Sequence, residues 1–101
     1  MEQSPAQEFD AELNRVVTRL RTIALIKLPE IATPVEQLTA ELLHLCSNFG
    51  DPAQQSLPSY ELRASGDVVM VLATDARKAA QDDQQILHVT AALTAARRAL
   101  P

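Results

Sequence analysis

Histidine and cysteine side chains are the first candidates for metal binding or nucleophilic chemistry in this sequence. His44 and Cys46 lie two residues apart in a helical pattern, and His88 is the second histidine. Positions two apart on a helix point about 200° away from each other around its axis, so His44 and Cys46 cannot bind one ion. A nucleophilic pair would need the fold to bring His88 to Cys46, and no cationic residue flanks Cys46 to activate its thiol. We therefore expect no metal, no cofactor and no enzymatic activity.

Neighbouring carboxylates are the second group of candidates. Asp82 and Asp83 directly precede an apolar run of helical period, and acids in that place are typical of a helix cap. Asp67 and Asp75 lie eight residues apart, which on a helix places them about two turns apart and roughly 80° around the axis. That spacing is more typical of a solvated edge than of a pair for acid–base chemistry.

The charge distribution argues against nucleic acid and membrane as partners. The formal net charge is −4, and the longest basic runs are the pairs Arg77–Lys78 and Arg97–Arg98. Nucleic-acid binding needs a larger set of cations on one face. The longest unbroken apolar runs, 23–26 and 68–73, are far too short to cross a bilayer.

Cysteine usage and the amino terminus predict a cytoplasmic location. Cys46 is the single cysteine, so no disulfide can form within the chain, which fits a reducing compartment. Residues 1–4 lack the positive charge and apolar stretch that open a signal peptide.

Three helices carry clear start or stop signals. Ser4, Pro5 and Gln7 predict a capping box at the start of a helix over about 5–26, which Pro29 ends. Thr33 and Pro34 repeat this signal for a helix over about 34–48, and Gly50 occupies the position typical of a left-handed residue after a helix. Asp82 or Asp83 predicts the start of a last helix, over about 83–100.

The segment 60–73 allows two interpretations. Its apolar run and the Ser65–Gly66 turn signal are compatible with a β-hairpin over about 60–73. The alternative is a helix over about 67–81, capped by Ser65 or Asp67. We favour the helix, because its second half has high helix propensity and an isolated hairpin is marginally stable. Its predicted core residues are Val68, Val71, Leu72, Ala76 and Ala79.

Three stretches of the chain resemble a group of small uncharacterised actinobacterial helical proteins. They are LNRVVTRLRTIALIKL near the start, GDVVMVLATDA in the middle and ALTAARRAL at the end. The resemblance implies a bacterial cytoplasmic protein without an assigned activity. It singles out Asp67 and Asp75 as the polar positions to inspect.

Together these signals predict one all-α domain over residues 1–101. Its four helices most simply form an antiparallel bundle, with a longer loop between the second and third helices. Residues 1–4 and 101 are expected to be disordered ends. The expected function is protein–protein interaction, including self-association. The alternative is a small-molecule-binding module with a pocket near the 50–64 loop.

Apolar residues outside the predicted core predict a homodimer. They are Val69 and Met70 in the third helix and Leu87 in the fourth. A small bundle has limited interior, so some of these side chains should reach the surface and mark an association site. The alternative is that Val69 and Met70 pack under the 50–64 loop in a monomer.

Overall fold

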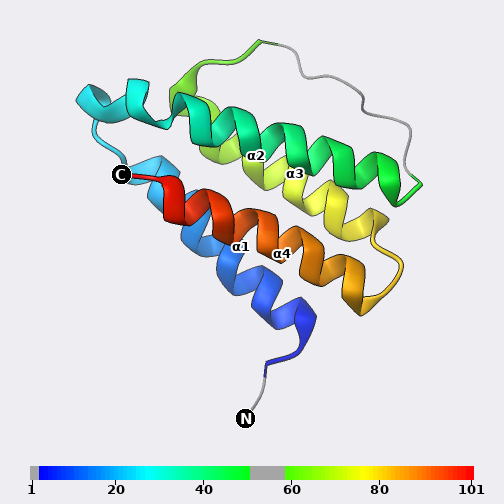
Figure 1. Ribbon diagram of the computed structural model, residues 1–101. Helices are drawn as coiled ribbons and strands as arrows, with labels where there is room; N and C mark the ends of the chain where they lie inside the picture. Colours follow the sequence, from blue (N-terminus) through cyan, green and yellow to red (C-terminus); the bar gives the residue numbers. More distant parts are fainter. Residues whose placement is uncertain (1–2, 51–58) are drawn as a thin grey trace.

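The computed structural model describes residues 3–50 and 59–101, and in these ranges the chain is helical without a strand (Figure 1). The predicted all-α, four-helix architecture is confirmed, and the hairpin over 60–73 is not formed. Two short 3-10 turns, η1 and η2, precede the second and third helices. The elements are α1 Pro5–Thr22, η1 Leu25–Lys27, α2 Leu28–Asn48, η2 Leu62–Ala64, α3 Ser65–Ala79 and α4 Asp83–Ala99.

Local capping signals define several helix ends. The Ser4 side chain accepts a hydrogen bond from the Gln7 amide at 3.2 Å, and the Gln7 side chain accepts one from the Ser4 amide at 3.0 Å. Asp82 caps α4 through the Gln85 amide at 2.9 Å. Gly50 has a φ of +97° after α2, a conformation that glycine adopts without strain. These three predictions are confirmed.

The boundary between α1 and α2 differs from the prediction. Helix α1 ends at Thr22 rather than near residue 26, and α2 begins at Leu28 with Pro29 in its first turn. Pro34, predicted to start the helix, lies inside it and leaves one backbone carbonyl without its usual donor. The extra turns bury Ile31 completely, and this burial offsets part of that cost.

The helices pair in a way that the sequence did not indicate. Helix α1 packs against α3 and α4, and α2 packs against the same two helices from the other side (Figure 1). Glu12 meets Arg97 and Arg19 meets Pro101, so α1 and α4 run in the same direction. Helices α2 and α3 are also parallel, since the chain after α2 contacts the chain after α3 through a 3.1 Å bond from Gln81 to the Phe49 carbonyl. The simple antiparallel arrangement is therefore wrong for these two pairs.

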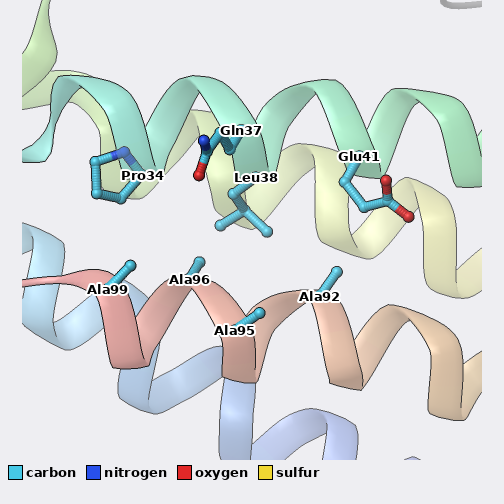
Figure 2. A pocket seen from close by; sticks show the side chains of 8 residues that line it. All are labelled: Pro34, Gln37, Leu38, Glu41, Ala92, Ala95, Ala96 and Ala99. Atoms are coloured by element: carbon cyan, nitrogen blue, oxygen red, sulfur yellow. The ribbon is translucent and has the colours of Figure 1, made fainter.

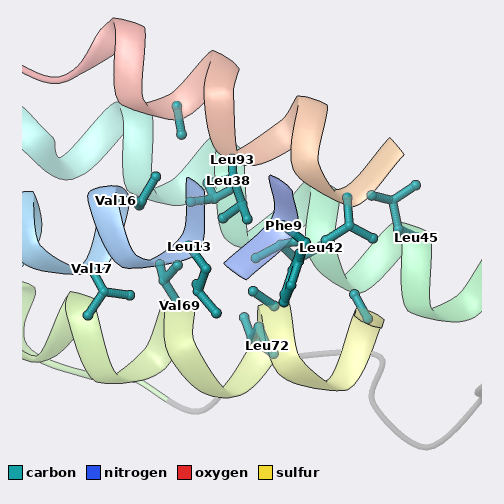
Figure 3. Close-up of a cluster of buried hydrophobic side chains, with 14 of the residues drawn as sticks. Phe9, Leu13, Val16, Val17, Leu38, Leu42, Leu45, Val69, Leu72 and Leu93 are labelled. Atoms are coloured by element: carbon teal, nitrogen blue, oxygen red, sulfur yellow. The ribbon is translucent and has the colours of Figure 1, made fainter. Parts of the chain in front are cut away.

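The core is formed mainly by aliphatic side chains from all four helices, together with Phe9, Cys46 and Phe49 (Figure 3). Helix α3 is rotated relative to the predicted orientation. Val69 is fully buried, whereas Val71, predicted to be in the core, is 56% exposed. The buried positions of α3 are Ser65, Gly66, Val69, Leu72, Ala73 and Ala76.

The start of α3 lies close to the end of α1. A Cβ added at Gly66 would lie 2.9 Å from Cγ of Arg21, so the glycine permits this close approach. Neither Ser65 nor Asp67 caps the helix, because both lie inside it after Ala64. Ser65 instead donates a hydrogen bond to the Leu62 carbonyl.

Ser4 and Pro101, which lie near the two ends of the described chain, each form a hydrogen bond. Ser4 belongs to the capping box, and the backbone oxygen of Pro101 accepts a hydrogen bond from Arg19, although both were expected to be disordered. The rest of the predicted amino-terminal disorder falls partly on residues 1–2, which lie outside the described residues.

Candidate functional site

The structure does not place the histidines and the cysteine in one accessible site. Cys46 is buried in the core, whereas His44 and His88 are exposed on α2 and α4. His44 is hydrogen-bonded to Asn48 on the same helix, at 3.0 Å. In the described ranges, no group of three or more potential metal ligands comes together.

Asp67 and Asp75 lie near opposite ends of α3. Asp67 is exposed and forms an ion pair with Arg21 at 2.7 Å, which joins α3 to α1. Asp75 is half-buried and lines a surface hollow with Lys78 at the other end of the helix. Eight residues of helix separate the two carboxylates by about 12 Å along the axis, so they do not form one site.

The three residues expected to mark an association surface have different environments. Val69 is part of the core and cannot belong to a surface patch, so this part of the prediction is wrong. Met70 is half-buried and packs against the core, and Leu87 is partly exposed on α4. The segment Val68–Leu72 is apolar on all sides, so the packing of α3 against α1 and α2 decides which side is buried.

Two valines of α3 provide a direct test of this orientation. We expect Val69→Ala to lower the free energy of unfolding by about 1–3 kcal/mol, because it leaves a cavity in the core. Val71→Ala is the matched control, and it should stay within about 0.5 kcal/mol of the wild type. Urea unfolding of both variants measures the difference. Equal effects, or a larger loss at Val71, would show that α3 has the other orientation.

A buried carboxylate that sequence reasoning missed joins α1 to α4. Glu12 is 5% exposed and accepts hydrogen bonds from Arg97 Nε at 2.5 Å and from Arg15 Nη1 at 3.1 Å. The signal was present in the spacing, since Glu12 follows Phe9 by three residues and precedes Val16 by four, both of which are core positions.

Two opposing effects act on the pKa of Glu12. Burial by itself raises the pKa, because it disfavours the charged carboxylate. Hydrogen bonds from Arg97, Arg15 and Thr94, together with the positive charge of Arg97, outweigh burial and hold the pKa below its ordinary value. Glu12 is therefore an ionised, fully paired structural group rather than an acid or base with a free position for substrate.

An exposed apolar pair lies in η1, between α1 and α2. Leu25 is 74% exposed and Ile26 is 86% exposed. Large aliphatic side chains that are adjacent and this exposed are informative, because isolated ones are common on protein surfaces. We call the surface formed by Leu25, Ile26 and the lining of the hollow beside them the Leu25 end. Sequence analysis placed both residues at the end of the helix predicted over about 5–26 and did not identify them as a site.

A hollow that is lined by Ile23 and Lys27, the residues on either side of this segment, contains two cations. It has a volume of about 180 Å³ and is lined by Arg19, Thr22, Ile23, Lys27 and Pro101. Arg19 is bonded to the Pro101 backbone oxygen, and Lys27 is exposed. The Leu25 end therefore combines apolar side chains with positive charge.

Two other hollows offer less distinctive chemistry. A shallow groove of about 130 Å³ separates α2 from α4, and Figure 2 shows its lining of small and polar side chains. Four alanines of α4 form one wall, opposite Pro34, Gln37, Leu38 and Glu41. The second hollow, of about 380 Å³, lies next to Gly50 and is lined by Phe49, Gly50, Asp75, Lys78 and Ala79.

The fold and its surface define an all-α, four-helix domain with an apolar and basic patch at one end. In the parts of the chain that the structure describes, no helix has both the length and the apolarity needed to span a membrane. No protein-family model, curated protein or solved structure matches this chain. The resemblance to actinobacterial helical proteins stays a prediction.

Proposed function

We propose that this chain is a protein-interaction module that binds its partner through the Leu25 end. The observation that carries the proposal is the exposure of Leu25 and Ile26 side by side. Full burial of an aliphatic side chain of this size contributes about 1.5–3 kcal/mol, so covering both would supply a useful part of a binding energy. The fold gains nothing from these two side chains in their exposed positions.

The placement of the reactive side chains supports interaction rather than catalysis. Cys46 is buried whereas His88 is exposed, and Asp67 and Asp75 lie near opposite ends of α3. Both carboxylate oxygens of the ionised Glu12 accept a hydrogen bond, one from Arg97 and one from Arg15. Cytoplasmic location and bacterial origin, both expected from the sequence, are part of this proposal.

The test compares partner capture by matched variants. The immobilised wild type and the double variant Leu25→Ser/Ile26→Ser are exposed to extract of the host, and Val71→Ser serves as a control at an exposed apolar residue on another helix. We expect a partner that the wild type and the control retain and that the double variant loses. Calorimetry with the purified partner should then show that the double variant weakens binding by at least about tenfold. A partner that binds all three proteins equally would contradict the proposed surface.

Self-association is a second form of this proposal. The homodimer expected from the sequence loses the support of Val69, but Met70 and Leu87 are partly accessible, and Val71 adds an exposed apolar residue. Light scattering coupled to size exclusion should give about twice the 11.0 kDa of one chain if the dimer forms. A mass near that of one chain at every concentration would end the dimer proposal and would not affect the proposal for the Leu25 end.

The hollow next to Gly50 favours a small-molecule-binding module as the alternative function. Its volume of about 380 Å³ is comparable with small-ligand pockets, and Asp75 and Lys78 supply opposite charges. A ligand screen observed by nuclear magnetic resonance tests this alternative. Ligands that shift Phe49 and Lys78 and are lost in Asp75→Asn would support it, whereas ligands that bind this variant equally well would contradict it.

A further inference from the structure

The linker between α1 and α2 contributes little to the core. Residues 23–27 join the two helices at one end of the bundle (Figure 1), and the turn η1 within them has no buried residue. Ile23 is the linker residue that packs against the core. Leu25 and Ile26 are the most exposed large apolar side chains among the described residues. The linker can therefore change its conformation at a small cost in core packing.

Helix α1 forms its contacts with helices that lie far along the chain. It packs against α3 and α4, on the opposite side of these two helices from α2, to which the linker joins it. The ion pair of Arg21 with Asp67 joins α1 to α3, and that of Glu12 with Arg97 joins α1 to α4. A second copy of the chain presents the same α3 and α4. Two copies can therefore exchange their α1 helices and keep these contacts.

We propose that two copies of the chain exchange α1 through an opened linker, and that Leu25 and Ile26 of both copies meet where the two linkers cross. In such a dimer each chain passes from one four-helix unit to the other through residues 23–27, so both linkers lie at the two-fold axis. The exchange conserves the contacts of α1 with α3 and α4. Burial of apolar side chains that the monomer exposes is then the net gain, and it opposes the entropic cost of association.

The exchange differs from the other modes of association that the surface allows. The monomer keeps Leu25 and Ile26 accessible to the partner of the proposed function, whereas the exchanged dimer covers them with a second copy. A dimer through the exposed apolar residues of α3 and α4 would leave this pair in solvent. Because the exchange needs no other protein, it stands or falls separately from the proposed function.

The first experiment measures whether a dimer forms and which residues stabilise it. The full chain is concentrated in urea near the midpoint of unfolding, so that the linker can open, and the urea is then removed. We expect light scattering coupled to size exclusion to show a fraction at about twice the 11.0 kDa of one chain. Leu25→Ser/Ile26→Ser should raise the dissociation constant of this dimer by at least about tenfold. Val71→Ser/Leu87→Ser, the matched control at exposed apolar residues of α3 and α4, should leave it unchanged.

The second experiment detects the exchange of α1 itself. Isotope-labelled and unlabelled chains are mixed in urea and refolded together, and isotope-filtered nuclear Overhauser spectra then report contacts between different chains. Arg21 of α1 lies next to Gly66 of α3, where an added Cβ would be 2.9 Å from Cγ of Arg21. We expect a signal between Arg21 and Gly66 in the dimer fraction, because this contact then joins two chains. In the monomer fraction the contact lies within one chain, so the filter removes its signal.

Three results would overturn the exchange. The first is a mass near that of one chain at every concentration. The second is a dimer without the signal between Arg21 and Gly66 of different chains. The third is a dimer that Leu25→Ser/Ile26→Ser weakens no more than Val71→Ser/Leu87→Ser does. Each of these results leaves the capture of a host partner to its own test, because that test uses the surface of the monomer.

Discussion

Leu93→Ala is expected to lower the free energy of unfolding by about 3–4 kcal/mol. Leu93 is fully buried in α4, and Figure 3 shows it in the core beside Leu38 of α2. Because α4 packs against both α1 and α2, a cavity at this position removes contacts with two other helices at once. Loss of a buried leucine side chain costs both the energy of its transfer from water and the energy of the cavity that remains.

Leu87→Ala is the matched control for this variant. It makes the same substitution in the same helix, so the change in helix propensity is the same, but Leu87 is partly exposed. We expect its effect to stay below about 1 kcal/mol. Urea unfolding monitored by circular dichroism gives both values. The slope of the unfolding free energy against urea concentration should be the same in both variants as in the wild type. Similar losses for the two variants would mean that Leu93 does not lie at the centre of the core.

Glu12→Ala is expected to lower the free energy of unfolding by about 2 kcal/mol near neutral pH. The substitution leaves Arg97 and Arg15 without their carboxylate at the contact between α1 and α4. Removal of one member of a fully buried pair costs more, but the Arg97 side chain is partly exposed and can regain water. The double variant Glu12→Leu/Arg97→Met should recover much of the loss, because it removes the half-buried Arg97 charge together with the carboxylate and leaves only Arg15, whose side chain is 63% exposed, without its partner.

The pH dependence identifies the carboxylate as the source of this effect. The pKa of Glu12 is lowered in the native protein from 4.5, so its contribution to stability is fully present above pH 4.5. That contribution is lost as the pH falls through the lower native pKa. The difference in unfolding free energy between wild type and Glu12→Gln should therefore shrink below pH 4.5. Glu36→Gln, at an exposed position of α2, should differ from wild type by less than about 0.5 kcal/mol. A difference that stays constant as the solution is acidified would refute this assignment.

The sequence alone determined the helices and several of their ends. The Ser4–Gln7 capping box, the Asp82 cap and the left-handed Gly50 depend on contacts within a few residues, so they can be predicted without knowledge of the fold. The core faces of α1 and α4 were also predictable, because their apolar residues recur with the helical period.

Tertiary packing decided what these local rules could not. Helix α2 begins six residues before Pro34, because the added turns bury Ile31 in the core. Helix α3 is apolar on every side over Val68–Leu72, so periodicity cannot select its buried face, and the packing of α3 against α1 and α2 does so. The parallel pairing of α1 with α4 and the burial of Glu12 depend on residues 85 positions apart in the sequence.

The candidate site also depends partly on features that the sequence determines and partly on features that the tertiary structure decides. The sequence by itself shows the positive charge of Arg19 and Lys27 and the apolar character of Leu25 and Ile26. The exposure of Leu25 and Ile26 cannot be predicted from the sequence, because an apolar residue in a helical pattern is equally compatible with the core. Helix α1 ends at Thr22 and α2 begins at Leu28, so the residues between them belong to neither helix. The packing of the four helices therefore leaves this short apolar segment facing solvent beside two cations. Only the tertiary structure shows that these apolar residues are exposed rather than buried.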